Sequence, residues 1–147
     1  EQTATVPAMD RPRFHLAIPV DDLAAARHFY GHVLGCPEGR SSDRWVDFDL
    51  HGHQLVVHLA DGAGDRANTP VDGDDVPVPH FGLLLSPPAW GRLADRLRAA
   101  GADFVVEPHT RFAGEPGEQS TMFLRDPAGN ALEFKAFATD EAIFARD

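Results

Sequence analysis

The spacing of apolar residues divides the chain into two series of elements with the same order. In the first series, three segments alternate between apolar and polar residues as strands do: residues 13–20, 44–50 and 53–59. Residues 22–34 have apolar side chains at helical spacing and are followed by Gly35. His51 and Gly52 separate the last two segments, as the turn of a tight hairpin would. The first series therefore predicts a strand, a helix and a hairpin.

The same order returns after a polar stretch rich in Gly and Asp. Four strand-like segments follow it: residues 80–86, 103–108, 119–125 and 130–137. Residues 87–101 predict a helix, with proline at its start and glycine at its end. The last two strands are joined by DPAG at 126–129, which suits a type I turn followed by a left-handed residue. The chain is thus predicted to be a tandem pair of half-units.

The predicted fold class is α+β, in one domain or two fused half-size units, as a chain of 147 residues with 43% hydrophobic content allows. The predicted parts are a flexible N-terminal arm at 1–12, a first module at 13–60, a linker at 61–77, a second module at 78–138 and a C-terminal tail at 139–147.

Aligning the two half-units pairs particular positions. On the opening strands, His80 comes 65 positions after His15. The glycines of the closing hairpins lie 77 positions apart, which sets Val56 opposite Glu133. The second half is therefore longer by 12 residues, and the excess lies in residues 109–119. This longer connection is a candidate lid.

Two histidines and one carboxylate form the ligand set of a facial-triad metal site. If the halves pack about a pseudo-twofold axis, equivalent strand positions meet near it, and His15, His80 and Glu133 would come together. Taken singly, each has a simpler interpretation, because strand histidines are often hydrogen-bonded core residues and strand glutamates often face solvent. The repeat equivalence of the histidines favours the metal site.

Composition narrows the functional classes. Lys and Arg number 13 against 23 Asp and Glu, a net charge of −10 that disfavours a nucleic-acid partner. No apolar run has the length of a membrane span and the first residues do not resemble a signal peptide, so we expect a cytoplasmic protein without a membrane partner. The single cysteine, Cys36, excludes an internal disulfide and is expected to be a small buried residue.

The segments FHLAIPVDDLAAARHFYGHVLG and MFLRDPAGNALEFKAF resemble the vicinal oxygen chelate superfamily, which includes glyoxalases, extradiol dioxygenases, fosfomycin-resistance proteins and bleomycin-binding proteins. The resemblance covers residues 13–137, and the DPAGN turn before the strand glutamate is its most specific element. PHFG, RFAGEPGEQSTMF and GNALEFKAF most resemble small extradiol-type dioxygenases. The resemblance implies two tandem βαβββ modules that form a curled mixed sheet around a metal, and a homodimer.

The resemblance also implies the ligands and the chemistry. His15, His80 and Glu133 occupy the three ligand positions of extradiol and fosfomycin-modifying enzymes, whereas glyoxalase-type sites add a fourth ligand where this chain has Val56. Three protein ligands leave an octahedral ion with positions for two substrate oxygens and for dioxygen. Fe(II) is expected first, and Mn(II) or another divalent ion second. The implied activity is extradiol-type cleavage of a small phenolic or vicinal-oxygen substrate by O2.

Six further side chains are candidate site residues by their position. His58 and Gln54 share the Val56 face of their strand, and His58 is the candidate acid and base. Lys135 shares the face of Glu133, where it could steer an anionic substrate. Three lie on or beside the long second-half loop as a candidate anion clamp and aromatic wall: Arg111, Phe112 and Gln119. A hydrogen-bonded histidine, an exposed lysine and a solvated loop are the simpler alternatives.

Two other functional classes stay open. One is a metal-dependent thiol transferase or isomerase, in which the metal acts as a Lewis acid without dioxygen. Typical extradiol enzymes have a tyrosine shortly before the glutamate, and residues 120–123 contain none. The other is a metal-free ligand-binding module of the bleomycin-sequestering kind. Such a module would have little use for two repeat-equivalent histidines and a matching carboxylate.

Overall fold

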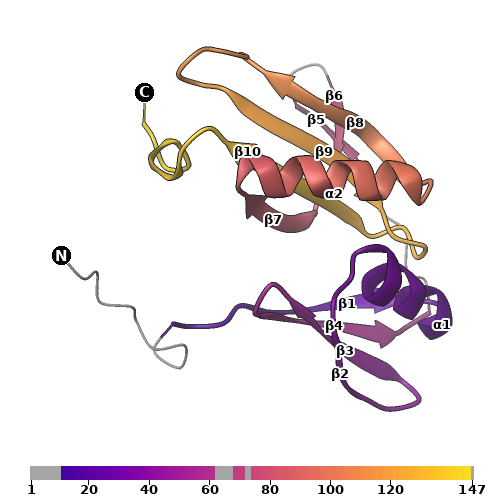
Figure 1. Ribbon diagram of the computed structural model, residues 1–147. Coiled ribbons are helices and arrows are strands. Elements are labelled where there is room, and N and C mark those ends of the chain that lie inside the picture. Colours follow the sequence, from indigo (N-terminus) through magenta and orange to yellow (C-terminus); the bar gives the residue numbers. More distant parts are fainter. Residues whose placement is uncertain (1–10, 62–67, 72–73, 147) are drawn as a thin grey trace.

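The computed structural model of the protein describes residues 11–61, 68–71 and 74–146, and its elements form two modules of the same order (Figure 1). The first module consists of β1 (His15–Val20), α1 (Leu23–Ala26), which continues as a π-helix (Arg27–Val33), β2 (Glu38–Ser41), β3 (Trp45–Leu50) and β4 (His53–Leu59). The second consists of β7 (Phe81–Leu85), α2 (Pro87–Ala99), β8 (Asp103–Arg111), β9 (Gln119–Arg125) and β10 (Ala131–Phe137). A short 3-10 helix (Asp140–Ala142) follows.

Each module contains one four-stranded mixed sheet, with the order β1-β4-β3-β2 in the first and β7-β10-β9-β8 in the second. The opening strand of each module pairs in parallel with its closing strand, and the other pairs are antiparallel. The predicted tandem α+β fold is confirmed. Within the described residues, no helix combines the length and the apolar character that a membrane crossing requires.

The strand registers agree with the alignment of the two halves. Ala17 lies opposite Val56 in the first module, and Gly82 lies opposite Glu133 in the second. Val56 and Glu133 are therefore equivalent in three dimensions, as the sequence predicted. A Cβ on residue 82 would overlap the carbonyl oxygen of Glu133, so glycine is what lets β7 lie this close to β10.

Three segments differ from their sequence interpretation. Strand β2 was not found from periodicity, because all its residues are exposed and its pairing with β3 is irregular. The described parts of the predicted linker contain β5 (Asn68–Val71) paired with β6 (Asp74–Pro77). Strand β8 extends to Arg111, so the candidate lid is reduced to a hairpin loop at 112–118. The predicted arm lies outside the described residues, apart from positions 11 and 12.

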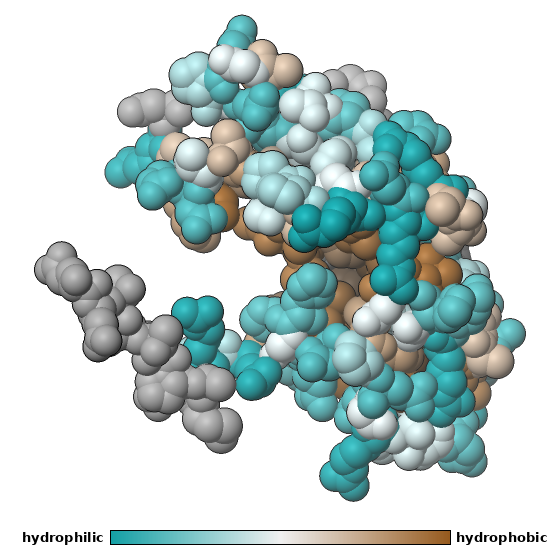
Figure 2. Space-filling view, viewed as in Figure 1, coloured by the Kyte–Doolittle hydropathy of each residue, from teal (hydrophilic) through white to brown (hydrophobic). Residues whose placement is uncertain are grey.

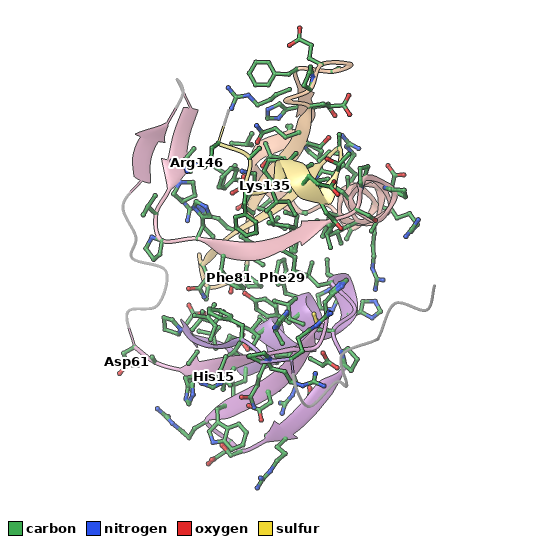
Figure 3. The ribbon with its side chains drawn as sticks, turned by 90° about the vertical axis from the view of Figure 1, so that its left-hand side faces the viewer. His15, Phe29, Asp61, Phe81, Lys135 and Arg146 are labelled. Carbon is green, nitrogen blue, oxygen red and sulfur yellow. The ribbon has the colours of Figure 1, made fainter. Side chains whose placement is uncertain are left out.

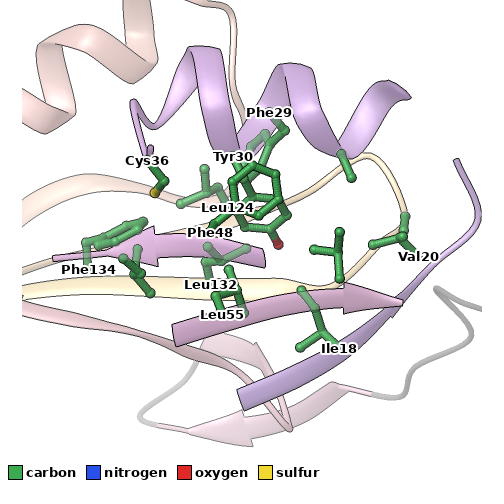
Figure 4. Close-up of a cluster of buried hydrophobic side chains, with 14 of the residues drawn as sticks. Ile18, Val20, Phe29, Tyr30, Cys36, Phe48, Leu55, Leu124, Leu132 and Phe134 are labelled. Carbon is green, nitrogen blue, oxygen red and sulfur yellow. The ribbon is translucent and has the colours of Figure 1, made fainter. Parts of the chain in front are cut away.

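The two modules share one hydrophobic core (Figure 4). Its fully buried large side chains come from both halves: Tyr30, Phe48, Leu55, Leu97, Met122, Leu124, Leu132 and Phe134. Cys36 lies in this core as expected. Burial, and secondly the charge of Asp49, raise the pKa of the Cys36 thiol to about 11, which keeps it protonated and unreactive at neutral pH.

A buried carboxylate joins the modules where the DPAGN turn meets the first helix. One oxygen of Asp126 accepts hydrogen bonds from the backbone N–H groups of Ala128 (2.9 Å) and Asn130 (2.8 Å), and the other accepts from the Tyr30 hydroxyl (2.7 Å) and the Asn130 amide (2.9 Å). The Asn130 amide also donates to the carbonyl of Pro19, at 2.7 Å. Because an unpaired buried charge is costly, these bonds fix how the modules meet.

We predict that Tyr30→Phe lowers the free energy of unfolding at pH 7 by about 1–3 kcal/mol, because buried Asp126 loses a donor. Burial, followed by the charge of Asp126 and its hydrogen bond, raises the pKa of Tyr30. The stability that this neutral phenol contributes is therefore complete below about pH 10, the pKa of tyrosine in the unfolded chain. It is lost as the pH rises from there toward the higher pKa of folded Tyr30. Urea denaturation should show that the free energies of unfolding of the wild type and Tyr30→Phe converge above that pH.

Tyr30 is the single tyrosine of the chain, so tyrosinate absorbance reports on it alone. Absorbance that appears at the pH of a free tyrosine while the protein is folded, or a stability difference that stays constant with pH, would contradict this prediction.

Candidate metal centre

His80 and Glu133 form the centre of the candidate site. His80 immediately precedes β7, and Glu133 lies on β10, the strand that pairs with β7. The Nε2 atom of His80 is 3.3 Å from Oε1 of Glu133, and the two side chains are 29% and 15% exposed. The structure therefore brings together two of the three predicted ligands.

His80 and Glu133 are each held in place by a hydrogen bond at the atom that does not face the other. Nδ1 of His80 is 2.7 Å from the carbonyl oxygen of Pro77, which can only accept, so Nδ1 carries a hydrogen and Nε2 faces Glu133. The hydroxyl of Thr121 donates to Oε2 of Glu133 at 2.6 Å, which leaves Oε1 toward His80. The His80 ring also packs edge-on against Phe123, with centroids 4.9 Å apart.

This arrangement has the chemistry of a divalent metal site. Metal-ligating histidines usually donate their other ring N–H to a carbonyl or carboxylate, and ligating carboxylates are hydrogen-bonded in turn. Both ring nitrogens of His80 face oxygen acceptors. A proton on Nε2 satisfies this geometry, and so does a divalent cation bound between Nε2 and the carboxylate of Glu133. The residues present therefore fit a divalent cation.

Thr121 was not predicted from the sequence as the partner of Glu133. Thr121 lies opposite Lys135 in the β9–β10 ladder, which places it on the same sheet face as Glu133 and diagonal to it. The hairpin register, counted back from the turn at 126–129, was the signal that could have identified it.

His15 lies apart from this pair. Its Nδ1 is 2.7 Å from Oε1 of Gln54, whose amide nitrogen is 3.3 Å from Oδ2 of Asp47. All three side chains line a cavity of about 580 Å³ over the sheet of the first module. Among the described residues, no three His, Cys, Asp or Glu side chains are grouped closely enough to hold a metal. One chain therefore does not assemble the predicted triad.

The separation follows from how the modules pack. The sheets meet through faces that contribute these core residues: Leu55 and Val57 from β4, and Leu132 and Phe134 from β10. Because side chains alternate along a strand, Gln54 and Glu133 lie on the opposite faces of their sheets, directed away from the shared core. Figure 3 shows Phe29 and Phe81 between the modules, with His15 on one sheet and Lys135 on the other.

The second module places further predicted residues on the face of Glu133. Three follow from the ladder of β8, β9 and β10: Lys135, Gln119 and Arg111. The Lys135 amine lies 5.3 Å from the centroid of the Phe137 ring. Phe112 follows β8, is 53% exposed and has the Arg111 guanidinium 5.7 Å from its ring centroid. This face therefore combines cations and aromatic rings beside the carboxylate.

His58 occupies the opposite end of the first sheet from His15. It is exposed and lies opposite Pro19 on β1, whereas Gln54 lies opposite His15. His58 is four positions after Gln54 on β4, a distance of about 13 Å along a strand. The structure thus brings Gln54 to His15 and leaves His58 farther along the same face.

The surface between the modules is hollowed and has apolar side chains at its base (Figure 2). A pocket of about 290 Å³ lies there, and its apolar lining includes Leu16 and Leu55 from the first module and Phe81 and Leu83 from the second. This pocket contains neither His80 nor Glu133, so it is separate from the candidate metal centre.

The fold is a tandem βαβββ architecture, and on its second sheet an imidazole and a carboxylate lie side by side. Residues 14–134 match the family model of the Glyoxalase/Bleomycin resistance protein/Dioxygenase superfamily. The chain belongs to this superfamily. No curated protein matches the sequence.

Solved structures with the same fold include a glyoxalase/bleomycin resistance protein/dioxygenase from Alicyclobacillus acidocaldarius, which is 33% identical, with a TM-score of 0.76 over 90% of this chain and 96% of that chain. The fosfomycin resistance protein FosX from Listeria monocytogenes is 15% identical, with a TM-score of 0.68 over 90% of this chain and 98% of that chain. Lactoylglutathione lyase from Agrobacterium tumefaciens is 22% identical, with a TM-score of 0.61 over 85% of this chain and 92% of that chain. The fold is therefore shared by proteins of different activities.

Proposed function

We propose that this protein is a divalent-metal-dependent enzyme that acts on a small substrate with vicinal oxygen atoms. The His80–Glu133 pair carries the proposal, because outer hydrogen bonds direct Nε2 and Oε1 toward one point. His15 would supply the third ligand. A FosX structure from Listeria monocytogenes contains Mn(II) and sulfate, which supports a divalent ion in this fold.

Three protein ligands fit this chain better than four. The position equivalent to Glu133 in the first module is Val56, which is apolar and 5% exposed. A valine has no donor atom for a metal. The remaining coordination positions would therefore be open to substrate oxygens and to a further small molecule.

A second copy of the chain can supply His15 to the His80–Glu133 pair. Strands β1 and β7 each form one edge of their sheet. His15 is the first residue of β1, and His80 immediately precedes β7. Phe14, next to β1, is 64% exposed and Leu84, in β7, is 50% exposed, as expected for edges that are covered on association. A twofold homodimer that joins β1 of one copy to β7 of the other would contain two equal sites.

The proposed reaction is extradiol-type oxidative ring cleavage, with Fe(II) as the first candidate ion. When bound, such an ion would supply redox chemistry with dioxygen, and the two substrate oxygens would chelate it. Lys135, Arg111 and Gln119 would bind the polar end of the substrate beside Glu133, and Phe112 would cover its ring. His58 lies farther along the face of the first sheet that carries His15, so its exposed imidazole would accept and return the substrate's hydroxyl proton through a bridging water.

A second reaction class uses the same centre. Thr121 lies in the segment without a tyrosine, and its hydroxyl donates a hydrogen bond to Glu133. This observation favours the Lewis-acid alternative, a thiol transfer or isomerisation that needs no dioxygen. A metal-free binding module is the weaker alternative, because it would not need the outer hydrogen bonds to His80 and Glu133.

We predict that the protein binds about one Mn(II) or Fe(II) per chain, and that His15→Ala, His80→Ala and Glu133→Gln abolish this binding. Thr121→Val should weaken binding by about 10–100-fold, because it removes the donor that orients Glu133, whereas Thr121→Ser should retain it. Calorimetric titration and metal analysis measure these effects. His28→Ala, on an exposed helical position, is the matched control. Unchanged affinity in both His80→Ala and Glu133→Gln would refute the centre.

We predict that the Fe(II)-loaded protein consumes oxygen with a panel of catechols and forms ring-opened products. His58→Gln should reduce kcat by about 100-fold or more while Fe(II) binding is unchanged, since it removes the acid and base. An oxygen electrode and product spectra are the measurements. Stoichiometric Fe(II) binding without oxygen uptake would reject the dioxygenase reaction and favour the Lewis-acid class.

A further inference from the structure

We propose that Gln54 and Asp47 are positioning residues that hold His15 in the tautomer whose Nε2 atom can bind a metal. The inference rests on the proposed function, and it changes the role expected for Gln54 from substrate binding to ligand orientation. Its evidence is a chain of two hydrogen bonds across three neighbouring strands of the first sheet, β1, β4 and β3.

The strand registers place the three side chains on one face. His15 lies directly opposite Gln54 in the parallel β1–β4 pair. Asp47 lies opposite Val56 in the antiparallel β3–β4 pair, and Val56 shares its face of β4 with Gln54. Asp47 is therefore the diagonal neighbour of Gln54, which is within reach of long side chains.

The direction of the hydrogen bonds is fixed by the carboxylate at one end. An ionised carboxylate only accepts hydrogen bonds, so Asp47 selects the amide nitrogen of Gln54, at 3.3 Å. The amide oxygen then faces His15, at 2.7 Å from Nδ1. Because that oxygen only accepts, Nδ1 of His15 must carry the hydrogen, and in the neutral imidazole Nε2 then keeps its lone pair.

Side-chain control of the tautomer matters more for His15 than for His80. A neutral imidazole in water favours the tautomer with the hydrogen on Nε2, which blocks the atom that a metal would need. His80 is held in the other tautomer by a main-chain carbonyl, that of Pro77, whereas exposed His15 depends on a side chain. The two repeat-equivalent histidines thus reach the same tautomer by different means. Only the hydrogen bond to His15 can be removed by a side-chain substitution.

The test combines a tautomer measurement with a metal titration. Nitrogen-15 NMR of the protein prepared without metal should show Nδ1–H for His15 in the wild type and a shift toward Nε2–H in Gln54→Leu. Gln54→Glu keeps an acceptor and should keep the Nδ1–H tautomer. Asp47→Asn should have a smaller effect, and none in the Gln54→Leu background, because Asp47 acts through Gln54. The Nδ1–H signal of His80 is the internal control in every variant, because its partner is a main-chain carbonyl.

Mn(II) titration provides the second readout. Gln54→Leu should weaken Mn(II) binding by about 10–100-fold, as other outer hydrogen-bond partners of metal ligands do. An unchanged His15 tautomer in Gln54→Leu, or a wild-type affinity for Mn(II) in that variant, would overturn the proposal. Absence of Mn(II) binding by the wild type would instead refute the metal centre, and the NMR measurement would still decide the role of Gln54.

Discussion

The buried carboxylate of Asp126 is the interaction on which the arrangement of the two modules depends. It accepts four hydrogen bonds, from its own turn and from Tyr30 across the module boundary. Each of these donors offsets part of the free-energy cost of burying the carboxylate. The turn, the first helix and the end of β1 are therefore held in one relative position, and the apolar faces of both sheets close over a shared core.

The orientation of the candidate ligands follows from that core. Each strand that contributes Leu or Phe to the interior must turn its alternate residues outward, so Gln54 and Glu133 lie on faces directed away from each other. The chain consequently presents two separate groups of candidate ligands. One has His80 and Glu133 in a fixed pair, and the other has His15 held by Gln54 over a cavity. The proposed homodimer would unite them.

Much of the fold could be predicted from the sequence because the two halves repeat. The equivalence of Val56 and Glu133, inferred from the glycines of two hairpins, agrees with the strand registers. Strand β2 could not be predicted, since its exposed residues have no apolar period. Thr121 and Asp47 are ordinary polar residues in sequence, and only the ladder shows what they contact.

The repeat also could not show where equivalent positions meet. Alignment identifies His15 and His80 as counterparts, but it does not distinguish a site within one chain from a site between two chains. That choice depends on which sheet faces pack together, and the apolar positions of both β4 and β10 are compatible with either arrangement until the core is seen.

The most direct test of the proposed shared metal centre is complementation between two variants that each lack one candidate ligand. His15→Ala and Glu133→Ala are produced together with different affinity tags, and the mixed dimer is isolated by two successive purifications. In the mixed dimer one site lacks both residues, whereas the other combines intact His15 from one copy with intact His80 and Glu133 from its partner. We predict about one bound Mn(II) per mixed dimer and none in either parent dimer. A mixed dimer as free of metal as its parents would contradict the account.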